Sequence, residues 1–326
     1  ARGGWAMNAP TQLPLTFRYA PRHVACFSKG HSSACAAIEV ARRYGTDGMV
    51  LLNHDINGRV EDPDVKRFGR EVAAYLGLPI TQADHARVDE WDQFDVVRDA
   101  GAFKVRNGQE LCTSRLKTEP FMRWVREHAT PGETVFHYGF DATEMHRVRR
   151  RASILGALGH RSDYPLALWP RTILSTREVG IEPPLTYSTF KHANCVGCLK
   201  AGRQHWYAVY ATRPDVWAKA KRTEDHIGYT IINGTSLDEI ESLFAQMVAA
   251  GVQPTEHVTP GRFWSDARKA VRHLPVVDEE VRAVPCECAT RLRSNRAPTP
   301  FCTCDGGHRH EPWCVAVWAD RYPEAA

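Results

Sequence analysis

The stretch His23-Val-Ala-Cys-Phe-Ser-Lys-Gly-His-Ser-Ser-Ala-Cys35 decides the fold that the sequence predicts. Val24 to Phe27 is a short apolar run, which is typical of a buried parallel strand. Residues 28–33 carry no apolar side chain, and a run of good helix formers with an apolar face then ends near Gly45. This order of strand, small polar loop and helix N-terminus points free backbone N–H groups at a ligand, so the loop is a candidate anion site. An ordinary strand-to-helix turn is the alternative, because Gly/Ser turns are common.

A second buried run, Met49 to Asn53, is followed by Asp55. Ligands of open parallel sheets bind beyond the carboxyl ends of the strands, so Asp55 is expected beside the first loop if the two strands are neighbours. It would bind a ribose hydroxyl or a metal, or merely cap a turn. The candidate nucleotide-binding residues are Ser28, Lys29, Gly30, His31, Ser32, Ser33 and Asp55.

The alternation of strands and helices predicts an α/β protein with a doubly wound, mostly parallel sheet. A helix is expected from the Asp62-Pro63 cap to Gly77, and strands at 78–81, 134–138 and 164–169, with a basic helix over 141–158. We expect four parts: an N-terminal arm (1–20), a nucleotide-binding domain with a CxxC pair (21–200), a helical C-terminal part (201–275) and a cysteine-rich tail (276–326).

The composition narrows the class of protein. The chain has 326 residues, of which 43% are hydrophobic, enough for a full core. A net charge of +4 is mildly basic and short of the footprint of a dedicated nucleic-acid binder, while an anionic small ligand is compatible with it. No run reaches the ~18 apolar residues of a membrane span. The first residues lack a signal-peptide pattern, so we expect a cytoplasmic protein without a membrane partner.

Ten cysteines in a cytoplasmic protein are more typical of metal ligands or catalytic thiols than of disulfides. Cys195-x-x-Cys198 has the spacing of two thiolates that share one metal, one iron–sulfur cluster or one redox disulfide. Cys112 is the candidate distant partner. The tail from Cys286 to Cys314 would bind a structural metal such as zinc, supply redox thiols, or have no joint role.

Two groups of residues resemble a known family. Ser28-x-Gly30-x-x-Ser33, followed by Leu51-Leu-Asn-His-Asp55, resembles the PP-loop superfamily of adenine-nucleotide enzymes, which includes the ATP pyrophosphatases and the sulfonucleotide (phosphoadenosine phosphosulfate) reductases. Cys112-Thr-Ser-Arg-Leu-Lys117, with Pro120-Phe121 and the later Cys195-x-x-Cys198, resembles the cysteine segments of the iron–sulfur reductases. The resemblance spans residues 20–245 and implies an adenine nucleotide alpha hydrolase-like fold.

The same resemblance implies a [4Fe–4S] cluster held by Cys112, Cys195 and Cys198. Leu111 stands where the reductases have a second adjacent cysteine, so the fourth iron position would be open or filled by another group. An adenine nucleotide, either a phosphosulfate or ATP, would bind the loop, and a thiol reductant is an expected partner. The residues implied to neutralise the anion during catalysis are Lys117, Arg147 and Arg150, although a basic helix is more commonly a solvated face.

The chain also departs from the family pattern. The strict loop of the ATP pyrophosphatases is Ser-Gly-Gly-x-Asp-Ser, whereas this chain has Lys29 and Ser32 at the first Gly and the Asp. The reductases end in a Glu-Cys-Gly-x-His motif, which Cys304-Asp-Gly-Gly-His308 matches only in part. The loop of this chain fits the reductases better than the ATP pyrophosphatases, so we expect a sulfonucleotide reductase-like enzyme. The alternatives are a PP-loop sulfur transferase that thiolates a nucleic acid or metabolite, and a nucleic-acid-binding protein with a degenerate loop.

Overall fold

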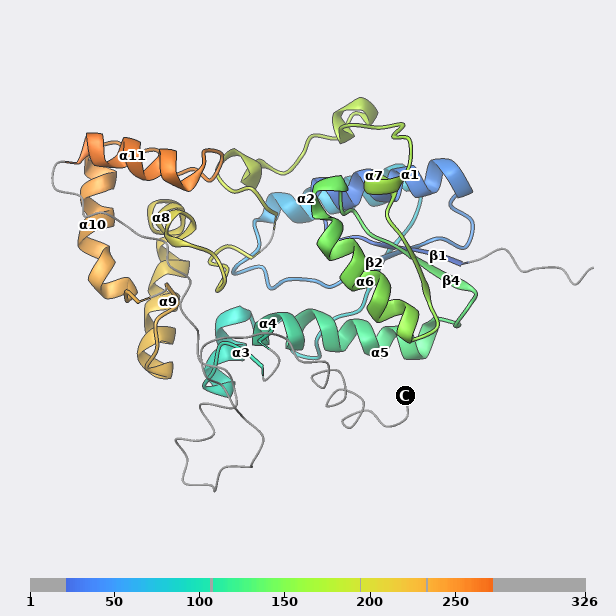
Figure 1. The fold of residues 1–326 in the computed structure, drawn as a ribbon, viewed down its shortest axis with the longest axis horizontal. Coiled ribbons are helices and arrows are strands. Elements are labelled where there is room, and N and C mark those ends of the chain that lie inside the picture. Colours follow the sequence, from blue (N-terminus) through green and yellow to red (C-terminus); the bar gives the residue numbers. More distant parts are fainter. Residues whose placement is uncertain (1–21, 106–107, 194, 233, 272–326) are drawn as a thin grey trace, which may run out of the picture.

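The computed structural model describes residues 22–105, 108–193, 195–232 and 234–271. Within these ranges a single sheet contains five strands, all parallel, in the order β3-β2-β1-β4-β5 (Figure 1). The strands are β1 (Arg22–Cys26), β2 (Val50–Asn53), β3 (Ile80–Gln82), β4 (Thr134–His137) and β5 (Arg161–Asp163). The predicted α/β class with a parallel sheet is confirmed. The predicted N-terminal arm and cysteine-rich tail lie outside the described residues.

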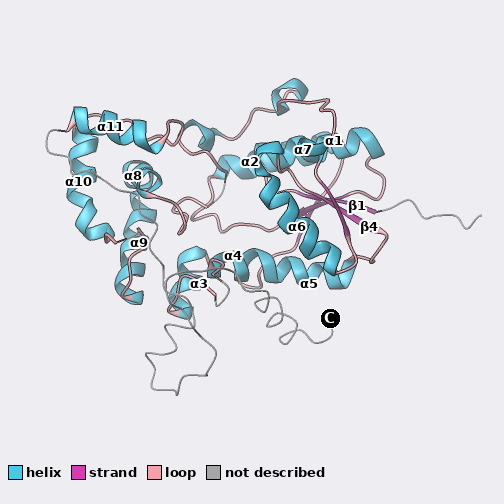
Figure 2. Ribbon diagram, in the orientation of Figure 1, coloured by secondary structure: helices cyan, strands magenta, loops and turns pink. Residues whose placement is uncertain are grey.

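Helices cover both faces of the sheet (Figure 2). On β1 and β2, Ala25 and Leu51 face one hydrophobic cluster with α1 (His31–Tyr44) and α2 (Pro63–Leu76). The alternate residues Val24 and Leu52 face a second cluster with α5 (Glu119–His128) and α6 (Met145–Ala157). Burial on both faces explains why these strands are apolar runs without polar alternation.

The chain order places a crevice next to the first loop. From β1 the chain adds β2 and β3 on one side, then crosses to add β4 and β5 on the other. The strand order therefore reverses between β1 and β4, and loops after these two strands diverge there. The loop that follows β1 is the candidate anion site, so the topology puts it at the position where open α/β sheets bind ligands.

Six further helices of the described residues extend from the sheet toward the opposite end of the molecule, where α8 to α11 lie farthest from β1 and β4 (Figure 1). They are α3 (Gln93–Ala100), α4 (Leu111–Thr113), α8 (Arg203–Thr212), α9 (Pro214–Ile227), α10 (Leu237–Ala249) and α11 (Pro260–Ala270). One hydrophobic cluster joins them, with Phe94 and Leu111 packed among Trp206, Trp217 and Phe244. Short turns complete the chain: a π-helical turn η1 (Ser114–Thr118) and the 3-10 turns η2 (Ala142–Glu144), η3 (Thr176–Val179) and η4 (Leu185–Ser188).

Two elements differ from the prediction. The strand expected at 164–169 is wrong, because Pro165 begins the short helix α7 (Pro165–Leu168) and the last strand is β5, immediately before it. Helix α3 was not predicted, although its start carries a clear signal. The Asp92 side chain accepts hydrogen bonds from the N–H groups of Phe94 and Asp95. In turn, the Asp95 side chain accepts a hydrogen bond from the Asp92 N–H.

A histidine pair joins the neighbouring strands β1 and β4. His23 Nδ1 on β1 lies 2.9 Å from His137 Nε2 on β4. Burial lowers the pKa of both rings, and the pKa of His137, which also faces His23, falls to about 3. In the unfolded chain a histidine pKa is close to 6.5, so the unfolded state takes up protons first as the pH falls.

We predict that the free energy of unfolding decreases as the pH falls below 6.5 toward 3, because only the unfolded state then binds a proton at His137. For His137 alone the loss between pH 7 and pH 5 is about 2 kcal/mol. The His137→Gln variant should show a flatter pH dependence in urea denaturation. The variant His146→Gln, on the exposed surface of α6, is the control. An unchanged pH slope in His137→Gln would contradict the prediction.

Candidate functional site

The loop after β1 is closed by the side chain of Ser33, in the first turn of α1. Ser33 Oγ accepts from the Ser28 N–H and from the Ser28 hydroxyl, each at 3.2 Å, and donates to the Gly30 carbonyl at 2.8 Å. Ser33 is buried, whereas Ser28 and Ser32 are exposed. Ser33 therefore shapes the loop, and the exposed hydroxyls remain for a ligand.

Lys29, and not Gly30, has the unusual backbone in this loop. Lys29 has a φ of 57°, and among the described residues it is the non-glycine residue with positive φ. Gly30 is extended, at φ −92° and ψ 155°. Gly30 nevertheless lies close to another segment, because a Cβ at this position would be 3.3 Å from the Tyr187 hydroxyl. A left-handed non-glycine residue costs of order 1–3 kcal/mol and is characteristic of functional loops.

The Lys29 side chain is buried in a cluster of charges. Its ammonium group pairs with Asp55 and lies 3.1 Å from Glu61 Oε2, and Lys66 Nζ lies 3.0 Å from Asp55 Oδ2. Burial acts to raise the pKa of Asp55, but the two lysines hold it below its usual value. For Glu61 burial is stronger and the pKa is raised despite Lys29. Asp55 therefore lies beside the loop as expected, and its carboxylate binds the lysines.

Two glycines allow close contacts around the loop and the Lys29 side chain. A Cβ on Gly69 of α2 would lie 2.8 Å from Lys29 Cγ, so Gly69 leaves the path that the lysine follows. Gly139, after β4, would place a Cβ 2.7 Å from the Ser32 carbonyl oxygen and 2.8 Å from Ser33 Cα. The loop after β4 therefore contacts the first turn of α1 directly, and larger residues at Gly139 would displace that turn.

Residues 170–190 pass over the N-terminus of α1. The Tyr187 hydroxyl accepts the His31 backbone N–H at 3.0 Å, which is one of the free amides expected to face a ligand. The His31 ring accepts the Thr176 N–H and lies 3.3 Å from Ser175 Oγ. Tyr187 is thus a residue of the site that no local sequence pattern indicates.

The arginines of α6 differ in their surroundings, and the predicted contacts of Arg147 and Arg150 with an anion stay predictions. Arg147 pairs with Glu144, and its guanidinium lies 4.1 Å from the centroid of the Phe140 ring. Arg150 is exposed. The neighbouring Arg151 is half-buried, with its guanidinium 5.2 Å from the Tyr138 ring and 5.7 Å from the Phe121 ring. Arg151 is therefore the arginine of this helix that reaches toward the carboxyl ends of the central strands.

Cys112, Cys195 and Cys198 come together although they are distant in sequence, and all are free thiols. Burial, together with the neighbouring Cys195 and Cys198, raises the pKa of Cys112 to about 12. Burial also raises the pKa of Cys195, while the nearby ammonium of Lys117 lowers it. Cys112 begins the helical segment whose π-helical turn carries Lys117, and such turns occur frequently at functional sites.

The CxxC loop is held by contacts from several elements. The Val196 N–H donates to the Val60 carbonyl at 2.7 Å, and the Gln93 amide donates to the Val196 carbonyl at 2.8 Å. The Cys198 N–H donates to His205 Nε2 at 3.2 Å, and His205 Nδ1 lies 2.8 Å from Glu256 Oε1. Because Nε2 accepts, Nδ1 carries the proton that bonds the carboxylate.

Glu61 connects the loop to the cysteines. One of its oxygens accepts from Lys29 of the loop, and its charge raises the pKa of Cys195. Its other oxygen, Oε1, is buried without a hydrogen-bond partner among the described residues. The loop, the carboxyl end of β2 and the cysteines thus form one site.

Within the described residues no group of three or more His, Cys, Asp or Glu side chains is placed to hold a metal ion. Membrane-spanning helices are likewise absent from the described part of the chain, since none is long and apolar enough. Comparison of the chain with models of protein families, with curated proteins and with solved structures found no match.

We predict that Lys29→Met destabilises the protein by about 3–5 kcal/mol, because the buried Glu61 carboxylate would lose its near cation and keep only Lys66, 3.7 Å away. Lys66→Met removes a cation that is 34% exposed and should cost at most about 1 kcal/mol. Urea denaturation of both variants measures the difference. Equal losses in the two variants would show that burial of Lys29 does not control the stability of the loop.

Proposed function

We propose that this chain is an adenine-nucleotide-binding iron–sulfur enzyme of sulfur chemistry, related to the PP-loop sulfonucleotide reductases. One observation carries the proposal: Glu61 accepts from Lys29 of the candidate anion loop, and the adjacent Val60 carbonyl accepts the Val196 N–H of the CxxC pair at 2.7 Å. A loop suited to an anion and a set of thiols suited to a metal cluster are therefore joined through two neighbouring residues. That combination is the one implied by the resemblance of the two motifs.

The sheet supports an adenine nucleotide alpha hydrolase-like fold as part of this proposal. Its parallel strands reverse order between β1 and β4, and the Ser28–Ser33 loop lies at that point. Phosphate or sulfate would contact the exposed hydroxyls of Ser28 and Ser32 and the free amides of the first turn of α1. The Tyr187 hydroxyl accepts a hydrogen bond from one of these amides. A bound anion would either replace the hydroxyl as the acceptor or accept a hydrogen bond from it.

Positive charge for the anion would come mainly from Lys117 and Arg151. Lys117 acts on the pKa values of His54, after β2, and of Cys195, so it lies between the sheet and the cysteines. Arg151 adds a second cation beside His54 and Cys26. Arg147, next to Phe140 at the end of β4, and the exposed Arg150 stay proposed contacts for a larger ligand. The role of Lys29 is to hold the loop.

The three thiols fit an iron–sulfur cluster by their chemistry. Cys112, Cys195 and Cys198 are soft ligands and come from two separate segments, and the cation of Lys117, which acts on Cys112 and Cys195, would offset cluster charge. Thiolates on a cubane are farther apart than those on a single ion, because the cluster lies between them. When bound, the cluster would supply electron transfer and an iron position open to sulfur. The three cysteines would anchor it, and the His205–Glu256 pair would fix Cys198.

Sulfur transfer is the second candidate reaction. Leu111 precedes Cys112 and packs fully buried in the core, and its hydrocarbon side chain provides no fourth ligand. Three protein thiolates leave one iron free, which suits an enzyme that carries sulfur to a substrate as well as one that reduces a sulfonucleotide with a thiol reductant. The tail cysteines, a candidate zinc site, lie outside the described residues.

We predict that Gly30→Val abolishes the binding of adenine nucleotides at the Ser28–Ser33 loop, because its side chain would contact Tyr187 and Ser28 there. Isothermal titration with ATP and with adenosine phosphosulfate measures the affinity. Gly58→Val, at an exposed glycine with open space around its Cβ, is the control and should bind as the unchanged protein does. Equal affinity in the Gly30 variant would contradict binding at this loop.

We also predict that anaerobically purified protein contains iron and sulfide. Cys112→Ala, Cys195→Ala and Cys198→Ala should each lose most of both, together with the visible absorption of the cluster. Cys35→Ala removes a buried thiol of α1 and should retain them. Full iron and sulfide in the first three variants, or a protein that holds only zinc after anaerobic reconstitution, would overturn the cluster assignment.

A further inference from the structure

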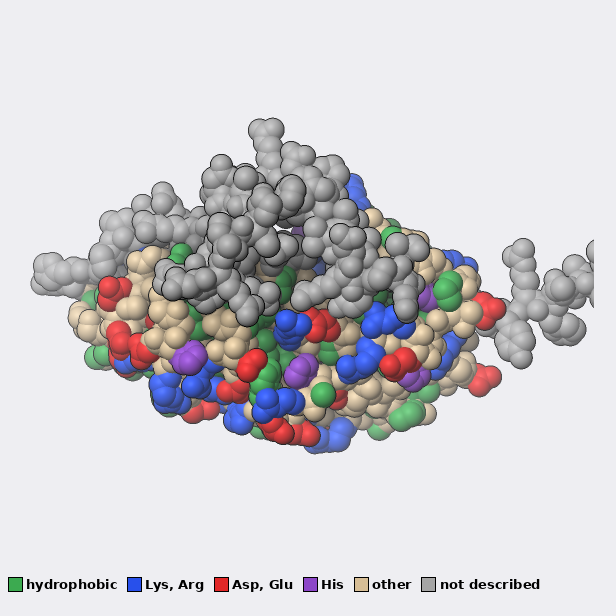
Figure 3. Space-filling model, turned by 90° about the horizontal axis from the view of Figure 1, so that it is seen from below, with side chains coloured by type: hydrophobic (Ala, Val, Ile, Leu, Met, Phe, Trp, Pro, Cys, Tyr) green, Lys and Arg blue, Asp and Glu red, His purple; other side chains and the backbone are tan. Residues whose placement is uncertain are grey.

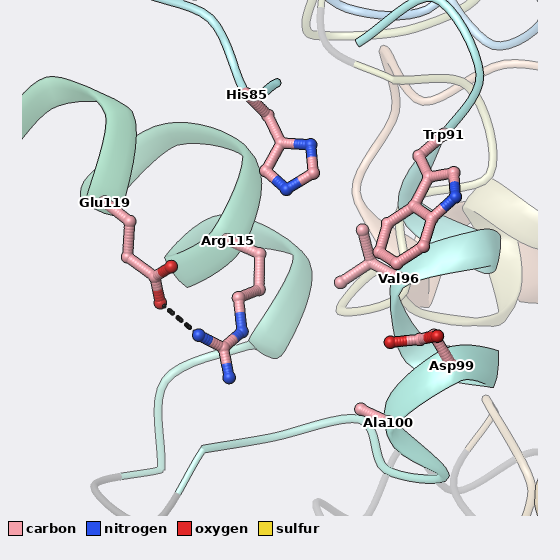
Figure 4. A pocket seen from close by; sticks show the side chains of 7 residues that line it. All are labelled: His85, Trp91, Val96, Asp99, Ala100, Arg115 and Glu119. Atoms are coloured by element: carbon pink, nitrogen blue, oxygen red, sulfur yellow. Dashed lines mark hydrogen bonds and ion pairs between the residues drawn. The ribbon is translucent and has the colours of Figure 1, made fainter. Parts of the chain in front are cut away.

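A cavity of about 500 Å³ lies between the segment after β3, helix α3 and the helical segment that follows Cys112 (Figure 4). His85 and Trp91 come from the first segment, and Arg115 and Glu119 from the opposite wall. Val96, Asp99 and Ala100 complete the lining from α3. The function proposed above uses none of these side chains.

Planar groups line one side of the cavity. The rings of His85 and Trp91 are nearly parallel, at 19°, with centroids 5.7 Å apart. The Arg87 guanidinium lies 4.2 Å from the centroid of the Trp91 ring. Trp91 is half-buried, and its indole projects toward the open space in Figure 4. A series of stacked planar groups beside an open space favours a flat aromatic ligand.

Polar groups on the other sides suit the edge of such a ligand. Arg115 donates to Glu119 at 2.9 Å and keeps further N–H donors. The Asp99 carboxylate, which is exposed, faces Arg115 across the space (Figure 4). Burial lowers the pKa of His85; Glu119 acts to raise it, and the nearby Arg123 and Arg87 lower it further. Donors and acceptors side by side match the edge of a nucleobase.

We propose that this cavity binds the nucleobase of a nucleotide, with Trp91 as the stacking surface and Arg87, Arg115 and Arg123 near the phosphate. A purely apolar ligand would make no use of Arg115 or Asp99. An uncharged sugar would not use the guanidinium groups. Nucleotides combine a flat base with an anion, which is the combination that the lining offers.

The position of the cavity relates it to the cysteines. Arg115 follows Cys112 by a single helical turn, so a base in the cavity would lie beside the candidate sulfur site. The Ser28–Ser33 loop lies elsewhere on the sheet, at the end of β1, and the cavity proposal does not depend on it. A nucleotide in the cavity would be a second one, either free or part of a single strand.

The surrounding surface indicates how a strand would bind. Where the described side chains are visible from below, Lys and Arg alternate with Asp and Glu and form no continuous basic stripe (Figure 3). Affinity from backbone charge alone would therefore be small. Binding would depend on the base in the cavity, and the aromatic side chain is the group to test.

The test measures fluorescence anisotropy of short labelled single-stranded DNA and RNA, with AMP and CMP as competitors. Trp91→Leu should weaken binding about tenfold or more, as expected for one lost stacking contact. Arg115→Gln, which alters a partly exposed side chain and should fold normally, should weaken it as well. Competition by mononucleotides assigns the cavity to free nucleotides, and binding of strands alone assigns it to a nucleic acid.

Matched controls separate this site from others. Trp169→Leu removes another half-buried tryptophan, immediately after α7, with an arginine 4.4 Å from its ring. Arg262→Gln removes another surface arginine with an acidic partner four residues later. Both should bind as the unchanged protein does. Gly30→Val should also bind, because it alters only the loop. Unchanged affinity in both cavity variants, or no binding of any nucleotide or strand by the unchanged protein, would overturn the proposal.

Discussion

The buried ammonium group of Lys29 is the interaction on which the candidate site depends. A charge taken out of water is costly unless it is paired, and here carboxylates from two other segments, Asp55 and Glu61, surround it. The pairing holds Lys29 in a left-handed backbone that it would otherwise avoid, and Gly69 leaves room for its side chain. The loop after β1, the end of β2 and the start of α2 are therefore held together by one cation.

The same carboxylate cluster connects the sheet to the cysteines. Glu61 lies next to Val60, whose carbonyl accepts the Val196 N–H, so the CxxC loop is attached to the end of the sheet. From the other side Gly197, at φ 74°, packs against Val216 and Phe94, where a Cβ would lie 2.6 Å from Val216 Cγ1. The helical part of the chain thus contributes directly to the position of the thiols. In the proposed enzyme its packing would decide how the cluster lies relative to the loop.

Particular residues show where sequence reasoning succeeded. The Asp62-Pro63 start and the Gly77 end of α2 were predicted, because caps are local: Asp62 accepts the Asp64 N–H, and Gly77 has a φ of 65°. Lys117 and the three cysteines act on one another's pKa values, and their joint role at a cluster stays a prediction. The strand β5 was missed, and so was the approach of Arg151 to the Tyr138 ring. Which side of α6 faces inward depends on how the helix packs, and an all-basic run conceals it.

The sequence by itself determined the α/β class, the parallel strands and the candidate loop, because apolar runs, caps and turn residues act over a few neighbouring positions. It also singled out the cysteines as a set. The tertiary structure alone decided that Lys29 is buried and that Tyr187 bonds an amide of the loop. It likewise decided that His205 and Glu256 hold Cys198, and that His85 and Trp91 line a cavity with Arg115. These contacts join residues far apart in the chain, and their partners are chosen by packing and by the energy of buried charge, which no local pattern records.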